Sequence, residues 1–439
     1  MDIIFAHSDD IVVPLLVEWL DIVDVVRFDS ACSLSRRNRG SLQRIFALPQ
    51  VVFQHVQRMT NCFDHVGYWN WLLRKMVKLV EVVITLEMDI GTKKLVEKYI
   101  TMCGSAVRHL EFASYDSKIM SAAMKHCRSL KRLSIDGGND IENNAVLYSD
   151  SVETFYLSNE YFDMSDNICV NFPNLKDLTL VQSYINDAVL ISTVQHSPKL
   201  QKLKLAEAEE LTAASYAAIG QHCKCLERFT VYCMPFSSAY LTSILPFTPQ
   251  LNELSLCHTS GLVEAHVVFE TLAFHCPNLT ELSLGENDAA PYAAILNAFT
   301  AMLINCALLH TLTMEGCSFV TDDFLLAIAS EATQIGNLHL PDCNVSNAGL
   351  ACVAKHCTEL EWVSVSIGSE YAATKDCVKM FRKETKVRIA NVDDMYGYSG
   401  GVSVSAGGGG VQEGNDSNID IDDDETSSID SDAMDVSDG

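Results

Sequence analysis

The sequence predicts an α/β solenoid of about twelve strand–helix repeats, with a small all-α segment before it and a disordered tail after it. The main observation is a short phrase that recurs from Leu79 onward, with apolar residues at its first, fourth and sixth positions. Its copies begin 22 to 30 residues apart, at residues 79, 107, 130, 152, 175, 200, 226, 251, 279, 309, 335 and 360. A repeat of this length buries its apolar face only against its neighbours, so we expect a curved stack whose function lies in binding surfaces.

Each repeat is expected to contain one strand and one helix. Residues 200–205, LQKLKL, show the strand part, because apolar and polar residues alternate. In a later repeat, Thr321 is placed to cap a helix in which Phe324, Ala327 and Ile328 recur at helical spacing. Strands should line the inner side of the stack and helices the outer side.

Cysteines keep a fixed position in these repeats. Five lie three residues before the first apolar position of a copy: Cys127, Cys223, Cys276, Cys306 and Cys357. Three further residues lie eight positions after a first position: Cys317, Cys343 and Asn287. Together with the period and the strand phrase, this placement resembles the cysteine-containing class of leucine-rich repeats over about residues 79–365. The resemblance implies a relation to the substrate receptors of SCF-type ubiquitin ligases.

Four His-Cys pairs raise the question of a metal or a nucleophile: His126-Cys127, His222-Cys223, His275-Cys276 and His356-Cys357. They recur once per repeat and should therefore lie about one repeat apart. Zinc needs four ligands at one point, and a Cys-His nucleophile needs its own orienting group. We therefore expect core cysteines, with no metal site, no cofactor and no enzymatic activity in this chain.

The third, fifth and seventh positions of each phrase should face away from the helices. The residues predicted to bind a partner there are Arg132, Tyr156, Lys202, Lys204, Arg228, Tyr232, His339 and Trp362, the last as an exposed aromatic side chain. An acidic or phosphorylated protein segment would suit the four cations. The alternative is a mixed polar row without a specific ligand, which any solenoid presents on its exposed strands.

The first 50 residues lie outside the repeat and contain three short amphipathic patterns. Ser8 is placed to cap a first helix, whose apolar stripe is Ile11, Val12, Leu15, Leu16, Trp19 and Leu20. Asp24 is placed to cap a second helix with Val25 and Val26, and a third helix is expected at residues 42–46.

Three such helices directly before the repeats resemble an F-box. The resemblance implies that the SCF adaptor, and through it the cullin, is bound by Leu15, Leu16, Trp19, Leu20, Val25 and Val26. The sequence departs from the family at Val13, where a leucine usually precedes the proline, and at Asn38, where a tryptophan is usual. The alternative is a helical cap over the exposed core edge of the first repeat.

Charge is distributed unevenly along the chain. The net charge is -26, and of the 57 Asp and Glu residues 13 fall in residues 391–439, which contain no Lys or Arg. Such a composition builds no core, so we expect a disordered tail. An acidic chain without a basic stripe is not expected to bind nucleic acid. The predicted segments are therefore 1–50, F-box-like; 51–78, connecting; 79–390, solenoid; and 391–439, acidic tail.

The N-terminal residues also bear on localisation. Acids stand where a secretory leader would need bases, and the most apolar stretch is interrupted by Glu18, Asp21 and Asp24. We expect no signal peptide and no membrane span. The 16 cysteines should then be reduced thiols of a cytoplasmic or nuclear protein.

The two resemblances together imply the substrate-recognition subunit of an SCF-type ubiquitin ligase, which would hold a protein substrate on its inner face for ubiquitin-dependent degradation. A stand-alone leucine-rich-repeat interaction scaffold is the alternative. In either role the chain would supply binding and orientation, while any catalysis would belong to partner subunits.

Overall fold

The structure is a computed structural model of the 439-residue chain, which forms two units, residues 1–396 and 397–439. It describes residues 12–13, 17, 22–32, 36–48, 51–53, 65–86, 88–113, 116–136, 146–158, 169–181, 185–259, 264–285, 291–366 and 387–391. Apart from Asn391, the predicted acidic tail lies outside the described residues.

A parallel sheet of thirteen strands runs through the described part of the first unit, with each strand paired to the next along the chain except that β6 and β8 stand apart. The strands are β3 Glu81–Ile84, β4 His109–Phe112, β5 Arg132–Asp136, β7 Thr154–Ser158, β9 Asp177–Val181, β10 Lys202–Ala206, β11 Arg228–Tyr232, β12 Glu253–Cys257, β13 Glu281–Gly285, β14 Thr311–Glu315, β15 Asn337–Leu340, β16 Trp362–Val365 and β17 Arg388–Asn391. Each of the twelve predicted phrases supplies one of the first twelve strands. The predicted leucine-rich-repeat solenoid is confirmed.

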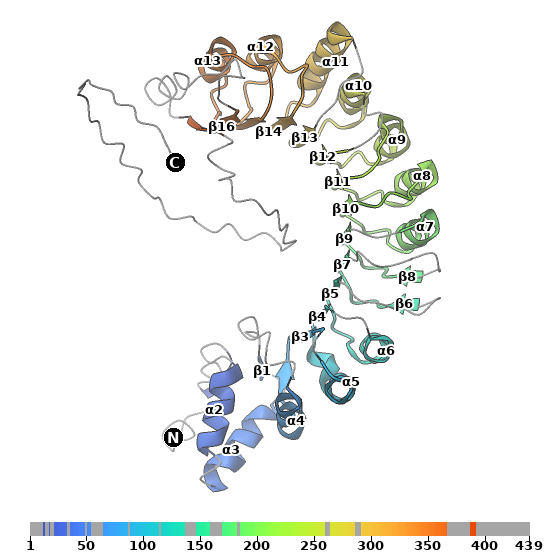
Figure 1. Cartoon of the computed structure of the whole chain (residues 1–439), viewed down its shortest axis with the longest axis vertical. Helices are drawn as coiled ribbons and strands as arrows, with labels where there is room; N and C mark the ends of the chain where they lie inside the picture. Colours follow the sequence, from blue (N-terminus) through green and yellow to red (C-terminus); the bar gives the residue numbers. More distant parts are fainter. Residues whose placement is uncertain are drawn as a thin grey trace, which may run out of the picture. The chain divides into compact units, whose positions relative to one another are not determined.

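Helices follow most strands and lie on one face of this sheet, which curves with its strands on the inner side (Figure 1). They are α5 Ile90–Cys103, α6 Ser117–His126, α7 Asp187–Gln195, α8 Ala213–His222, α9 Ser238–Ile244, α10 Ala265–His275, α11 Tyr292–Asn305, α12 Asp322–Glu331 and α13 Asn347–His356, with 3-10 turns η3 Gly104–Ala106 and η4 Leu245–Phe247. Side-chain caps begin several helices, and Asp116, for example, accepts hydrogen bonds from two backbone N–H groups. Thr321 stands at the N-cap of α12 as predicted, but its hydroxyl contacts the Tyr292 hydroxyl instead of the helix backbone.

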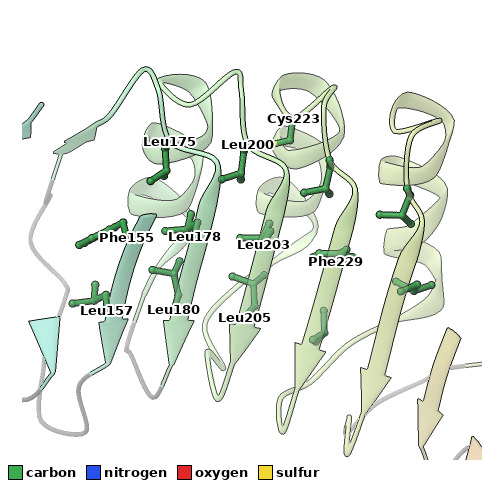
Figure 2. Close-up of a cluster of buried hydrophobic side chains, with 14 of the residues drawn as sticks. Phe155, Leu157, Leu175, Leu178, Leu180, Leu200, Leu203, Leu205, Cys223 and Phe229 are labelled. Atoms are coloured by element: carbon green, nitrogen blue, oxygen red, sulfur yellow. The ribbon is translucent and has the colours of Figure 1, made fainter. Parts of the chain in front are cut away.

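The core lies between the sheet and the helices. Leu178, Leu203 and Phe229 occupy equivalent positions in three neighbouring strands, pair in register and are fully buried. Figure 2 shows these side chains together with those of the flanking repeats on the helix side of the sheet. Because the strand period is two, the apolar positions of every phrase point into this layer and the intervening positions point away from it.

Two repeats depart from the predicted strand–helix unit. After β5 and after β7, the outer layer is formed by short strands, β6 Val146–Tyr148 and β8 Cys169–Asn171, which pair with each other. The described residues of these two repeats contain no helix, so the expected strand–helix unit is not found there. These two repeats advance by 22 and 23 residues. The repeat that begins at residue 107 also advances by 23 residues and contains α6, so repeat length alone does not account for the difference.

The N-terminal part contains α2 Ile22–Cys32, α3 Arg36–Phe46, β1 Val52–Phe53, α4 Val66–Lys75 and β2 Lys78–Leu79, and β1 pairs with β2. The third predicted helix corresponds to α3. Of the first predicted helix, only Val12, Val13 and Val17 are described, all in helical conformation. Helix α2 begins at Ile22, so Asp24 lies in its first turn and does not cap it.

Candidate functional site

The sheet face without helices, here named the inner face, is formed by the first, third and fifth residues of each strand. In β10, Lys202 and Lys204 are exposed on this face, whereas Leu203 and Leu205 are buried toward the helices. Neighbouring strands lie about 4.8 Å apart, so equivalent side chains of adjacent repeats form continuous rows. The predicted partner-binding residues on β5 to β16 are thereby brought onto one surface.

Opposite charges alternate at the centre of the inner face. Lys202 lies between Asp177 and Arg228 in the strand register. Arg228 forms an ion pair with Glu253, with 2.9 Å between Nη1 and Oε2. Burial raises the pKa of Asp177, while Lys202 and the nearby arginines oppose that shift. Because Glu253 neutralises part of the charge of Arg228, this arginine should attract an acidic ligand less strongly than an unpaired arginine would.

Lys204 has a different environment. Its neighbours in the register are Thr179 and Thr230, so hydroxyl groups stand on both sides of it. Lys202 and Lys204 are two residues apart on one strand, which places them about 7 Å from each other along its axis. Two exposed ammonium groups at this spacing can approach one carboxylate or phosphate together.

Arg132 and Tyr156 extend the centre toward the N-terminus. Arg132 is exposed between His109 and Thr154, and Tyr156 is half-buried between its strand neighbours. Burial, together with Arg132 and Arg108, lowers the pKa of His109, so His109 is neutral at pH 7. Arg132 is thus the main positive group of this region.

Further carboxylates stand on both sides of the centre of the inner face. On the N-terminal side, burial raises the pKa of Glu81, and burial together with Glu81 and Asp136 raises the pKa of Glu111. On the C-terminal side stand Glu253, Glu281 and Glu315. Repulsion at both ends would confine an acidic ligand to the centre.

Tyr232 contacts His258, which was not among the predicted partner-binding residues. Its ring meets the His258 ring edge-on, with 5.3 Å between centroids, and His258 Nε2 lies 3.5 Å from Glu315 Oε2. His258 directly follows β12 with a φ of 51°, and Glu207 and Cys233 take the same left-handed conformation after their strands. The repeat phrase ends before this position, so periodicity contains no signal for it.

His339 and Trp362, the two predicted partner-binding residues nearest the C-terminus, are partly buried. His339 Nδ1 lies 3.0 Å from Ser364 Oγ, and burial lowers the pKa of His339. Trp362 lies between Asn337 and Arg388 in the register and is half-buried, so the expectation of an exposed tryptophan is wrong. Its indole Nε1 is buried and has no hydrogen-bond acceptor among the described residues. The side chains on the neighbouring strands cover part of the indole ring. The sequence period does not predict such contacts between strands.

The predicted adaptor-binding residues are only partly described. Leu15, Leu16, Trp19 and Leu20 lie outside the described residues. In α2, Val25 is fully buried in the core and Val26 is half-buried.

Helices α2 and α3 also contact the connecting segment before the solenoid. Asp29 accepts hydrogen bonds from Trp71 Nε1 at 2.9 Å and from Lys75 Nζ at 2.7 Å, both from α4. Phe46 packs edge-on against Phe53 and Trp71. The N-terminal helices therefore pack on α4 and β1, and these two elements adjoin the first repeat through α5 and β2.

The repeated cysteines are buried thiols that end helices. Cys127, Cys223 and Cys276 are C-cap residues of α6, α8 and α10, and each backbone N–H donates to the preceding helical turn. Cys343 Sγ donates to the Met314 carbonyl at 3.0 Å, which links two repeats. In the part of the chain that the structure describes, no three His, Cys, Asp or Glu side chains are grouped so that they could hold a metal ion.

We expect these thiols to resist modification in the folded protein. Burial raises the pKa of Cys127, Cys223, Cys276 and Cys343 to about 12, so the reactive thiolate is a fraction of about 1 in 10,000 at pH 8. Mass spectrometry after treatment with iodoacetamide at pH 8 should find these four unmodified in the native chain and modified in urea. Rapid native labelling of any of them would contradict its buried position.

Within the described residues, no helix is long and apolar enough to span a bilayer.

The chain was compared with known protein families and with solved structures. No family model matches the chain. A crystal structure of a Rad7 and Elc1 complex in yeast is similar to it with a TM-score of 0.41 and 12% sequence identity, over 86% of this chain and 99% of that chain. The strand phrase, the parallel register and the single helical layer are the observations that define this chain as a leucine-rich-repeat solenoid.

Proposed function

We propose that this chain is the substrate-recognition subunit of an SCF-type ubiquitin ligase, which binds a protein substrate on its inner face for ubiquitin-dependent degradation. The observation that carries the proposal is the exposed pair Lys202 and Lys204 at the centre of a helix-free sheet face bounded by carboxylates. An acidic or phosphorylated segment of a substrate would complement this pair. The chain would supply proximity and orientation, and ubiquitin transfer would take place on other subunits.

The adaptor part of the proposal concerns the first 32 residues. Val25 was predicted to bind the adaptor, but it is fully buried in the core of this chain. Contacts to the adaptor would therefore come from Val26 and from the apolar stripe of the preceding segment, Leu15, Leu16, Trp19 and Leu20. The F-box resemblance of this segment supports the assignment.

Co-purification of the full chain with the SCF adaptor subunit tests the proposal. We expect a stable complex that Leu16→Asp and Trp19→Asp each weaken at least tenfold, because an apolar contact would be replaced by an unpaired charge. Gln43→Asp serves as the control, since Gln43 is exposed on α3 and should leave the complex intact. A folded chain that forms no complex with the adaptor would reject the ligase role.

A second candidate function is a stand-alone interaction scaffold whose N-terminal helices only cap the solenoid. The contacts of Asp29 with Trp71 and Lys75, and of Phe46 with Phe53, favour this candidate because they join the N-terminal helices to α4 and β1, which adjoin the first repeat. The two functions differ in one respect, since a cap has no need of the adaptor. The same co-purification therefore decides between them.

A further inference from the structure

Exposed apolar side chains gather in three consecutive repeats away from the inner face. Phe247, Phe274, Ile304 and Leu308, here named the edge patch, are 50%, 82%, 57% and 55% exposed. All four lie where a helix ends and the chain turns toward the next strand. Phe247 is the last residue of η4, Phe274 and Ile304 are next to last in α10 and α11, and Leu308 lies in the turn before β14.

These positions share one edge of the solenoid. The strands that follow them, β12, β13 and β14, pair in register, and α10 packs against both α11 and η4. Pro249 and Pro277, also exposed, occupy the turns between them and extend the apolar surface. The four side chains of the edge patch therefore follow one edge of three consecutive repeats.

Folding does not require apolar residues at this edge. Phe274 and Ile304 each stand two residues before the cysteine that ends their helix. At the equivalent position α6 has Lys125, α8 has Gln221 and α13 has Lys355. Since other repeats fold with polar residues there, the exposed aromatic and aliphatic side chains mark an interaction surface.

A positive charge lies at one end of the edge patch. Lys224 Nζ is 4.2 Å from the centroid of the Phe247 ring and donates a hydrogen bond to the Gly220 carbonyl at 2.6 Å. Lys199, exposed in the turn of the preceding repeat, extends the basic flank. The complement of this surface is an apolar segment with acidic residues at one end. A second copy of the chain fits less well, because a net charge of -26 makes copies repel each other.

We infer that the edge patch binds a protein segment whose apolar side chains contact Phe274, Ile304 and Leu308 and whose flanking carboxylates pair with Lys224. This site is separate from the inner face and does not depend on the function proposed above.

A phage-displayed library of random 16-residue peptides tests the inference. The library is selected on the immobilised full chain after counter-selection on the Phe274→Ser chain. We expect enrichment of peptides in which two or more apolar residues are followed or preceded by Asp or Glu. Enrichment of basic peptides, or no enrichment that depends on Phe274, would overturn the inference.

Fluorescence anisotropy with an enriched peptide then assigns the contacts. Phe274→Ser and Lys224→Glu should each weaken binding about tenfold or more, while Lys204→Glu on the inner face should leave it unchanged. Phe274 is largely exposed, so its substitution should not change the melting temperature. Analytical ultracentrifugation gives the oligomeric state. If the wild-type chain sedimented as a dimer and the Phe274→Ser chain as a monomer, the edge patch would be a self-association surface and the proposed partner would be rejected.

Discussion

Replacing Leu282 by Asp is expected to unfold the solenoid. Leu282 is fully buried in β13 and pairs in register with Leu254 of β12 and Leu312 of β14. Truncation of a buried leucine alone costs about 2–5 kcal/mol, and an unpaired buried carboxylate adds a further penalty. Because domains are stable by only about 5–15 kcal/mol, circular dichroism should show no cooperative melting transition.

The adjacent residue offers the matched control. Ser283 lies on the inner face and is half-exposed, so Ser283→Asp should melt close to the wild-type temperature. If Leu282→Asp melted like the wild type, the alternation of buried and exposed positions in β13 would be incorrect. The register of the repeats would then have to be reassigned.

Reversing the charges of Lys202 and Lys204 together is expected to abolish binding of partners to the inner face. A hydrogen bond to a charged group contributes about 1.5–3 kcal/mol, so the loss of two such bonds should weaken binding by about 100-fold or more. Both side chains are exposed, so the chain should stay folded, with a lower melting temperature because Lys202→Glu places a second carboxylate beside Asp177. Quantitative mass spectrometry of proteins that co-purify from cell extract with the wild-type and double-variant chains measures the effect.

Two variants make this experiment specific. Lys355→Glu makes one such charge reversal on α13, away from the inner face, and should retain the partners. Arg228→Gln should have a smaller effect than Lys204→Gln, since Arg228 is already paired with Glu253. Recovery of the same proteins at the same levels by the double variant would refute the assignment of substrate binding to this face.

The strands could be predicted because the alternation of apolar and polar residues that defines each strand lies within about six consecutive residues. Leu200, Leu203 and Leu205 specify both the strand β10 and the side of the sheet on which its core lies. The outer layer was less predictable, since the described residues after β5 and β7 form the strands β6 and β8 where helices were expected. The thirteenth strand, β17, was also not predicted, because residues 387–391 contain only part of the phrase.

The candidate sites show a similar division. Periodicity places Lys202 and Lys204 on the exposed face, and the structure has them there. It contains no information on side-chain pairing between repeats, and for this reason the ion pair of Arg228 and the burial of Trp362 were missed. Phe274 was missed for a different reason, because an apolar residue at a helix end is ordinarily assigned to the core. The roles of these residues in binding stay predictions.

The short outer strands have a geometric consequence for the surface on the opposite side. Packed helices lie about 8–10 Å apart and paired strands about 4.8 Å, so a strand–helix repeat is wedge-shaped and bends the stack. Where β6 and β8 pair behind β5, β7 and β9, the two layers have equal spacing and the wedge disappears. Arg132 and Tyr156 therefore stand on β5 and β7, where the smallest bend between neighbouring repeats is expected. A straight, extended segment can lie across this stretch, whereas the bent repeats beyond it favour a rounded partner surface.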